Sequence, residues 1–268
     1  MNEELCKQID RQCHILKLDF SSQEFVQMAQ DEAFTEDTID AIELLLARLS
    51  ERKKQVTIQT LLRLSRLPLK SPKTFENFDF SVFRGKNAPR LKSLKTLSAI
   101  YAHRNLAFIG PAGTGKTHLA QAFGYECCQR GLKTYFIKMT ELRDRFDTAR
   151  RTGKVSSILN GLVRPSCLII DEVGHCDFDK ENTRLFFDLI DRRYNKEGNY
   201  TTIFTSNKTP SEWHQTFDED DSLLCALDRI FDAATVFMLK GNSFRGVDCE
   251  TVPLITTKVK SIGSEAKD

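Results

Sequence analysis

A glycine-rich segment at residues 110–117, Gly-Pro-Ala-Gly-Thr-Gly-Lys-Thr, follows an apolar run at residues 106–109 that is typical of a buried strand. Its spacing, G-x-x-x-x-G-K-[S/T], is the P-loop pattern that holds nucleotide phosphates. The glycines allow a turn so tight that several backbone N–H groups point at one anion. Lys116 would contact the β- and γ-phosphates of ATP or GTP, and Thr117 would hold Mg²⁺. The predicted nucleotide-binding residues are Gly110, Pro111, Ala112, Gly113, Thr114, Gly115, Lys116, Thr117 and His118.

From residue 99 onward, short β-rich runs alternate with helical stretches. The runs cover residues 106–109, 134–137, 167–171, 201–205 and 235–239. Near-continuous apolar strands separated by helices are typical of a parallel sheet covered on both faces. We therefore predict an α/β fold whose ligand site lies at the carboxyl ends of the strands.

The first 70 residues predict a small all-α domain. Residues 21–24, Ser-Ser-Gln-Glu, match a capping box that opens one helix. Apolar residues at helical spacing predict a second helix from about Thr38, and a third from about Val56 to Leu67 that stops at Pro68. The expected organisation is a helical DNA- or partner-binding domain at 1–70, a linker leading to the nucleotide pocket at 71–98, the nucleotide-binding α/β domain at 99–250 and a polar tail at 251–268.

The composition is that of a globular protein without a membrane span. Hydrophobic residues make up 40% and charged residues 28% of the chain, and no apolar stretch approaches the roughly 18 residues that a spanning helix needs. The eight cysteines form no C-x-x-C pair, so we interpret them as free thiols in a reducing compartment. The N-terminus is too polar for a secretory signal, and we expect a cytoplasmic protein.

The net charge of +2 hides a strong asymmetry along the chain. Residues 48–73 hold eight basic side chains against Glu51 alone, and residues 84–95 hold five basic side chains and no acid. Such a local excess attracts a phosphate backbone, although a solvated helix face that binds nothing is the alternative interpretation. The candidates for contact with a DNA backbone are Arg52, Lys53, Lys54, Arg63 and Arg66.

Two carboxylates, Asp171 and Glu172, come directly after a third apolar run. This is the Walker B arrangement, in which Asp171 holds the magnesium ion and Glu172 orients the water that attacks the γ-phosphate. The second acid favours hydrolysis over a metabolic kinase. The fourth run ends in the polar triplet 205–207, where Asn207 would bond the attacking water or the phosphate; an ordinary turn residue is the alternative for an isolated Asn.

These motifs together resemble the IstB family of transposition helper ATPases. The resemblance includes Asp-Glu-Val-Gly at 171–174, Ala-Leu-Asp-Arg at 226–229 and Gly-Asn-Ser-Phe-Arg at 241–245, and it extends from about Thr74 to Gly246. That family belongs to the AAA+ class and is similar to the helicase loader DnaC. The resemblance implies a five-stranded parallel sheet in the order 5-1-4-3-2, ATP and Mg²⁺ bound between neighbouring subunits, and assembly on DNA.

The resemblance also implies roles for individual residues. Asn207 matches the sensor of the γ-phosphate, and Arg229 matches an arginine finger that reaches into the site of the next subunit. Arg245 matches a second arginine that contacts nucleotide or a neighbour, in cis or in trans. The predicted catalytic residues are thus Glu172, Lys116, Asn207, Arg229 and Arg245. Because few residues follow Arg245, we expect no full lid domain.

Three functions compete. The first is an ATP-dependent helper that assembles on target duplex DNA and recruits or stimulates a transposase. The second is a DnaC-like loader that prefers single strands and a helicase partner. The third is a nucleotide-binding module without a DNA role, which Glu172 argues against. Phe75, Phe78 and Phe80 precede the P-loop where this class cradles adenine, but they are at least as well explained as core residues.

Overall fold

The computed structural model describes residues 3–218, 221–232, 234–241 and 243, with no side-chain description at 221–225. Its centre is a five-stranded sheet in the order β2-β3-β4-β1-β5, with every strand parallel to its neighbours. The strands are β1 (Asn105–Ile109), β2 (Thr134–Lys138), β3 (Cys167–Val173), β4 (Thr201–Ser206) and β5 (Ala234–Met238). The predicted strands and their order are therefore confirmed.

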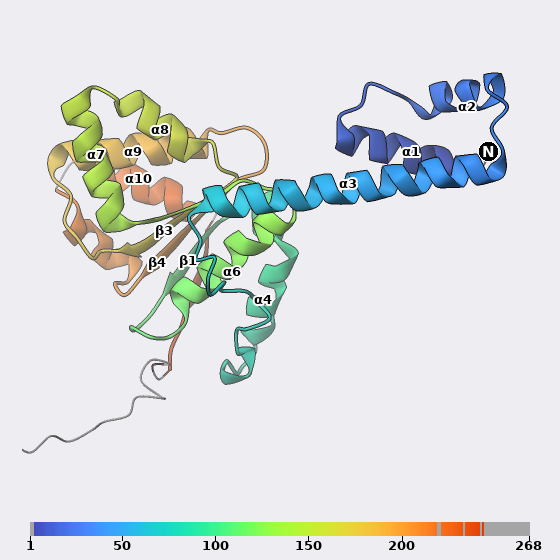
Figure 1. Cartoon of the computed structure of the whole chain (residues 1–268). Coiled ribbons are helices and arrows are strands. Elements are labelled where there is room, and N and C mark those ends of the chain that lie inside the picture. Colours follow the sequence, from blue (N-terminus) through green and yellow to red (C-terminus); the bar gives the residue numbers. More distant parts are fainter. Residues whose placement is uncertain (1–2, 219–220, 233, 242, 244–268) are drawn as a thin grey trace, which may run out of the picture.

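Helices cover both faces of this sheet (Figure 1). One face carries α6 (Lys116–Gln129), the short segment α4 (Ala88–Lys92), η2 (Ser93–Thr96) and α5 (Ser98–Tyr101), and the end of α3 (Glu36–Ser65). The other face carries α7 (Met139–Thr152), α8 (Val155–Val163), α9 (Lys180–Tyr194) and α10 (Asp221–Asp232). Residues of β1 to β4 alternate between the two cores, as Ile169 and Ile170 show on β3, whereas the edge strand β5 exposes Val236 and Met238. This explains the near-continuous apolar runs of the sequence.

The N-terminal helices form an arm that extends from the α/β body (Figure 1). Helices α1 (Glu3–Leu16) and α2 (Ser22–Asp31) pack near the start of α3 around the buried side chains of Ile9, Cys13 and Phe25. The capping box is confirmed, since Ser21 and Glu24 bond each other's backbone N–H groups. Helix α3, at 30 residues, is about 45 Å long.

The prediction of two separate helices over residues 38–67 was wrong, because α3 runs without a break from Glu36 to Ser65. The polar stretch between Leu49 and Val56 contains no Gly or Pro, and its residues are good helix formers. The Ser50 hydroxyl donates to the Ala47 carbonyl, 2.9 Å away, inside the helix. A polar stretch made of good helix formers therefore continues the helix instead of separating two helices.

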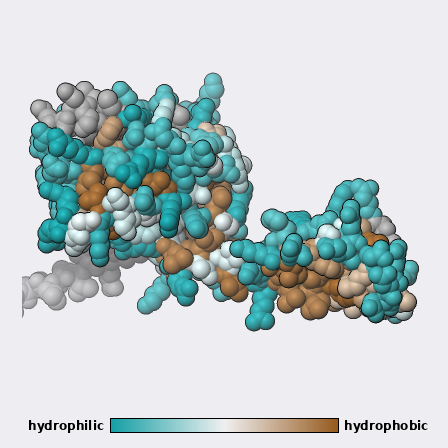
Figure 2. Space-filling view, turned by 90° about the horizontal axis from the view of Figure 1, so that it is seen from above, coloured by the Kyte–Doolittle hydropathy of each residue, from teal (hydrophilic) through white to brown (hydrophobic). Residues whose placement is uncertain are grey.

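Much of the arm exposes apolar side chains. Figure 2 shows hydrophobic residues gathered on it, and Leu44, Leu45, Leu49, Val56 and Leu64 of α3 are 43–63% exposed. No helix among the described residues is long and apolar enough to cross a membrane.

A buried arginine fastens the amino-terminal edge of the sheet. Arg193 of α9 is 1% exposed and donates to the Thr202 hydroxyl and to four backbone carbonyls at 2.7–3.2 Å. Burial lowers its pKa to about 10. The guanidinium thus joins the end of α8, the end of α9 and the start of β4.

Candidate functional site

The P-loop turns between β1 and α6 with a backbone that requires glycine. Gly115 has φ +87°, and a Cβ there would lie 2.8 Å from the ring of Phe78. At Gly110 the carbonyl oxygen of Leu239 lies where a Cβ would be. Lys116 is 8% exposed, and its Nζ donates to the carbonyls of Gly110 (2.8 Å) and Pro111 (2.6 Å). The ammonium group therefore lies inside the loop, where phosphates would bind.

Asp171 is buried at the end of β3 and receives two hydroxyl groups. Thr117 donates to its Oδ1 at 2.8 Å and Thr205 donates to the same atom at 2.6 Å. Burial raises the pKa of Asp171, while the two hydroxyl donors act in the opposite direction. Helix α6, β3 and β4 thus meet at one carboxylate oxygen.

Glu172 points away from this buried cluster because of a bulge in β3. Ile170 pairs with Phe204 and Val173 pairs with Ser206, so the intervening residues Asp171 and Glu172 face only Thr205. Glu172 has φ +62°, a strained value for a residue with a side chain. Its N–H donates to the Thr205 hydroxyl at 3.0 Å, which fixes the bulge. Two adjacent carboxylates thereby take different environments.

A cavity of about 680 Å³ lies between the P-loop and the carboxyl ends of β3 and β4. Of the predicted catalytic and metal residues, Lys116, Thr117, Glu172 and Asn207 line it. It is also lined by side chains to which the sequence analysis gave no role: Lys73, Gln121, His175, Thr205 and Lys208. The cavity is large enough for a nucleotide.

Lys138 is a further residue that sequence reasoning missed. It ends β2, pairs in register with Asp171, and its Nζ lies 3.1 Å from the Oε2 of Glu172. The hint in the sequence was a lysine at the carboxyl end of a predicted neighbouring strand. This ion pair is half exposed and orients the Glu172 carboxylate.

The segment before the P-loop contributes packing. Phe75 and Phe78 are buried in the core, Phe80 packs against it, and none of the three lines the cavity, which favours the core interpretation. His118 does line the cavity, and its Nε2 lies 2.9 Å from both the Thr74 carbonyl and the Asn77 Oδ1. Burial lowers the pKa of His118.

Arg229 lies at the amino-terminal ends of the strands, whereas the cavity lies at their carboxyl ends. It shares a small pocket with Asn105 and Thr202, at the amino ends of β1 and β4. Its Nη2 is 3.2 Å from Asp191 Oδ1, and its buried Nη1 has no hydrogen-bond partner among the described residues. Arg229 therefore cannot act on the cavity of its own chain. Arg245 lies outside the described residues.

Four of the five candidate DNA contacts lie on α3, where Arg52, Lys53 and Arg63 are exposed and Lys54 is half-buried, with Arg63 in the last turn next to the α/β body. Arg66 is engaged elsewhere, since its guanidinium pairs with Glu141 of α7 and bonds the Tyr135 hydroxyl at 3.3 Å. Arg66 thus anchors the arm to the α/β body.

The residues at Asp171 fit a magnesium ion. The hydroxyl of Thr117 and the carboxylate of Asp171 are hard oxygen ligands only 2.8 Å apart. Among the described residues no group of three or more His, Cys, Asp and Glu side chains could hold a metal alone. One or two protein oxygens completed by phosphates and water are the set that Mg²⁺ prefers.

Comparisons with known proteins agree with this geometry. The model of the family described as IstB-like ATP binding protein matches residues 11–249. The insertion sequence IS5376 protein of Geobacillus stearothermophilus, named as an ATP-binding protein, is 36% identical over 242 residues, which cover 89% of this chain and 94% of the relative. The corresponding IS21 protein of Pseudomonas aeruginosa is 30% identical over 80% of this chain and 78% of its own.

Solved structures show the same fold at low sequence identity. AMPPCP-bound DnaA from Aquifex aeolicus matches with a TM-score of 0.52 and 23% identity, over 66% of this chain and 52% of DnaA. DnaI matches with a TM-score of 0.54 and 17% identity, over 68% and 95%. Together with the P-loop, the acids of β3 and the strand order, these matches show that the chain belongs to the IstB-like ATP-binding family and is an AAA+ P-loop ATPase.

Proposed function

We propose that this protein is an ATP-dependent DNA-binding helper of transposition, which assembles on target duplex DNA and recruits or stimulates a transposase. Its relatives are named as ATP-binding proteins of insertion sequences, which supports a role beside a transposase. The observation that best supports ATP hydrolysis is the bulge that separates Asp171 from Glu172. It leaves Asp171 beside Thr117, where it would bind a metal ion, and leaves Glu172 in the cavity, where it would orient water.

In the proposed reaction, Lys116 and the N–H groups of the P-loop hold the phosphates of ATP. Asp171 and Thr117 would hold Mg²⁺, which would supply positive charge to the phosphate oxygens. Glu172 orients and polarises the attacking water, and Asn207 bonds that water or the γ-phosphate. Replacement of Glu172 by Gln should keep ATP bound and abolish turnover, whereas a kinase of small molecules would tolerate it.

The site is completed by a second copy of the chain. Arg229 lies at the amino ends of the strands, so in our proposal it enters the cavity of the neighbouring subunit as an arginine finger. Arg229→Ala should therefore bind ATP normally and hydrolyse it slowly. Mixing Arg229→Ala with Glu172→Gln should restore part of the turnover, because some interfaces then combine an intact Glu172 with an intact Arg229. If no mixture of the two variants regains activity, the shared site is refuted.

Arg52, Lys53, Lys54 and Arg63 would contact the DNA backbone without reading sequence. The test is duplex binding with Mg-ATP, with Mg-ADP and without nucleotide. The proposal requires tighter binding with ATP, and binding that is indifferent to nucleotide would count against it. A preference for single strands over duplex would favour the helicase-loader alternative.

A further inference from the structure

The α/β body carries its own basic surface, separate from the arm. It comprises α4, η2, α5 and the residues around them, from Arg84 to Arg104, and we call it the basic lobe. Its exposed cations are Arg84, Lys86, Arg90, Lys92, Lys95 and Arg104. The sequence contains no Asp or Glu between Asp79 and Glu126, so the lobe has no carboxylate of its own.

Neighbouring elements supply little negative charge to the lobe. Among the described residues, the one ion pair of these cations joins Lys95 to Glu76, at 3.5 Å. Glu126, the next acid along the chain, is paired with Arg130 at 3.0 Å. Unpaired cations concentrated on one face create a positive potential that a polyanion neutralises.

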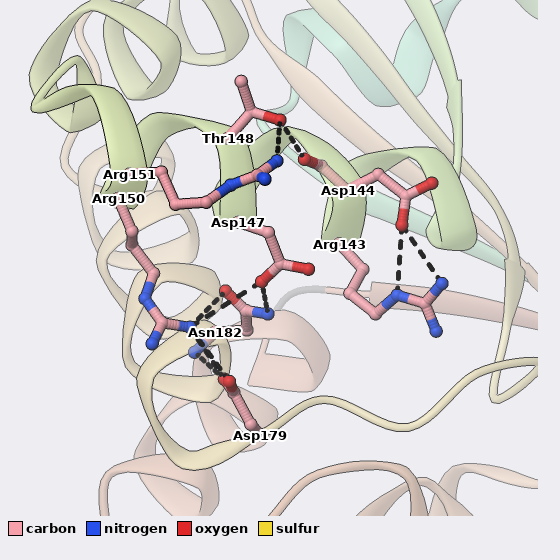
Figure 3. A network of polar contacts seen from close by, with 8 residues as sticks. All are labelled: Arg143, Asp144, Asp147, Thr148, Arg150, Arg151, Asp179 and Asn182. Carbon is pink, nitrogen blue, oxygen red and sulfur yellow. Dashed lines mark hydrogen bonds and ion pairs between the residues drawn. The ribbon is translucent and has the colours of Figure 1, made fainter.

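The arginines of α7 provide a contrast within the same molecule. Figure 3 shows Arg143 against Asp144, and Arg150 against Asp147 and Asp179, with ion pairs of 2.9–3.7 Å. Nearby carboxylates already neutralise both arginines, and the Arg150–Asp179 pair joins α7 to the start of α9. Within the part of the chain that the structure describes, neither Arg90 nor Arg104 is paired with a carboxylate.

Arg90 and Arg104 also frame a cavity of about 350 Å³. The exposed side chains of Arg90, Ser98 and Arg104 line it together with the buried rings and aliphatic groups of Phe123 and Leu106. Two guanidinium groups and a hydroxyl around one hollow are the donors that a backbone phosphate accepts from.

We infer that the basic lobe is a second contact site for the DNA backbone, in which Arg90 and Arg104 bind phosphate. This inference rests on the proposed function, since it concerns the same duplex. The end of α3 and η2 both pack against α6, so the basic part of the arm and the lobe lie on the same face of the sheet. A duplex held by Arg63 can therefore extend to the lobe.

The test is duplex affinity with Mg-ATP as a function of salt, measured by fluorescence anisotropy on a random-sequence duplex. Each lost phosphate contact reduces the slope of log K against log salt by about 0.9. Arg90→Ala with Arg104→Ala should lower the slope by about 2 and weaken binding roughly 30-fold at ~0.15 M salt. Arg90→Lys with Arg104→Lys should retain most of the slope, because the charges remain.

Lys180→Ala with Arg184→Ala on α9 is the control of equal charge, and it should bind duplex as the wild type does. Basal ATP turnover and the melting temperature should not change in either double alanine variant. A wild-type salt slope in Arg90→Ala with Arg104→Ala would overturn the inference. Loss of transposase stimulation with unchanged duplex affinity would also overturn it and would assign the lobe to a protein partner. If the wild type itself binds no duplex, the proposed function fails first.

Discussion

Thr205 offers the sharpest test of how the Walker acids are arranged. Its hydroxyl donates to Asp171 at 2.6 Å and accepts from the N–H of Glu172 at 3.0 Å, and the residue is 1% exposed. Thr205→Val keeps the shape of the side chain and removes both bonds. A hydrogen bond to a charged group contributes about 1.5–3 kcal/mol, which corresponds to roughly 10- to 100-fold in a binding constant.

Loss of this donor raises the pKa of Asp171 further, because hydrogen bonds to the carboxylate favour its charged form. Mg²⁺ requires that charged form. The Mg²⁺ concentration for half-maximal ATP turnover should therefore rise roughly 10-fold or more, and more at pH 6 than at pH 8. The assay is steady-state ATP hydrolysis in a magnesium titration at both pH values.

Thr201→Val is the matched control on the same strand. The Thr201 hydroxyl is also buried and donates to the Arg104 carbonyl at 2.6 Å, but at the other end of β4. This variant should lose stability without any change in the magnesium requirement. A wild-type magnesium requirement of Thr205→Val at both pH values, or an equal change in Thr201→Val, would refute this role of the Thr205 hydroxyl.

Three more predictions concern single contacts. Lys138→Met removes the half-exposed pair with Glu172, so kcat should fall about two- to fivefold with an unchanged KM for ATP; an unchanged kcat would show that the pair does not orient Glu172. Arg193→Met leaves buried carbonyls without a donor, and urea unfolding should show a loss of about 3 kcal/mol, whereas a loss below about 1 kcal/mol would contradict its structural role. Gly115→Ala forces a Cβ against Phe78 at positive φ, so ATP affinity measured by calorimetry should fall at least tenfold, and wild-type affinity would mean that the loop adapts.

The sequence predicted the sheet well because its parallel strands are buried on both faces and appear as apolar runs. The P-loop and the Asp171–Glu172 pair were also visible, since their residue types and spacing follow from phosphate and metal chemistry. The arm was predicted only in part. The polar stretch before Val56 resembles a break between helices, although nothing in it stops a helix.

Other parts of the site depend on pairing that spacing does not reveal. The bulge opposite Thr205 arises from how β3 and β4 align, and it decides which carboxylate faces the cavity. In the sequence, Arg66 cannot be told apart from the other basic residues proposed to contact DNA. In the fold, Glu141 lies beside it and forms an ion pair with it. The environment of the two carboxylates and the partner of Arg66 are both set by contacts between segments that are far apart in the sequence.

We propose that ATP in the P-loop cavity controls assembly on DNA, and the variant Lys116→Ala separates this control from binding that needs no nucleotide. The measurement is the amount of protein bound to a long duplex, by sedimentation or electron microscopy, with and without Mg-ATP. The wild type should fill the duplex only with ATP, and Lys116→Ala should neither bind ATP nor fill the duplex under any condition. Filling by Lys116→Ala to the wild-type level, without bound nucleotide, would show that ATP does not control assembly.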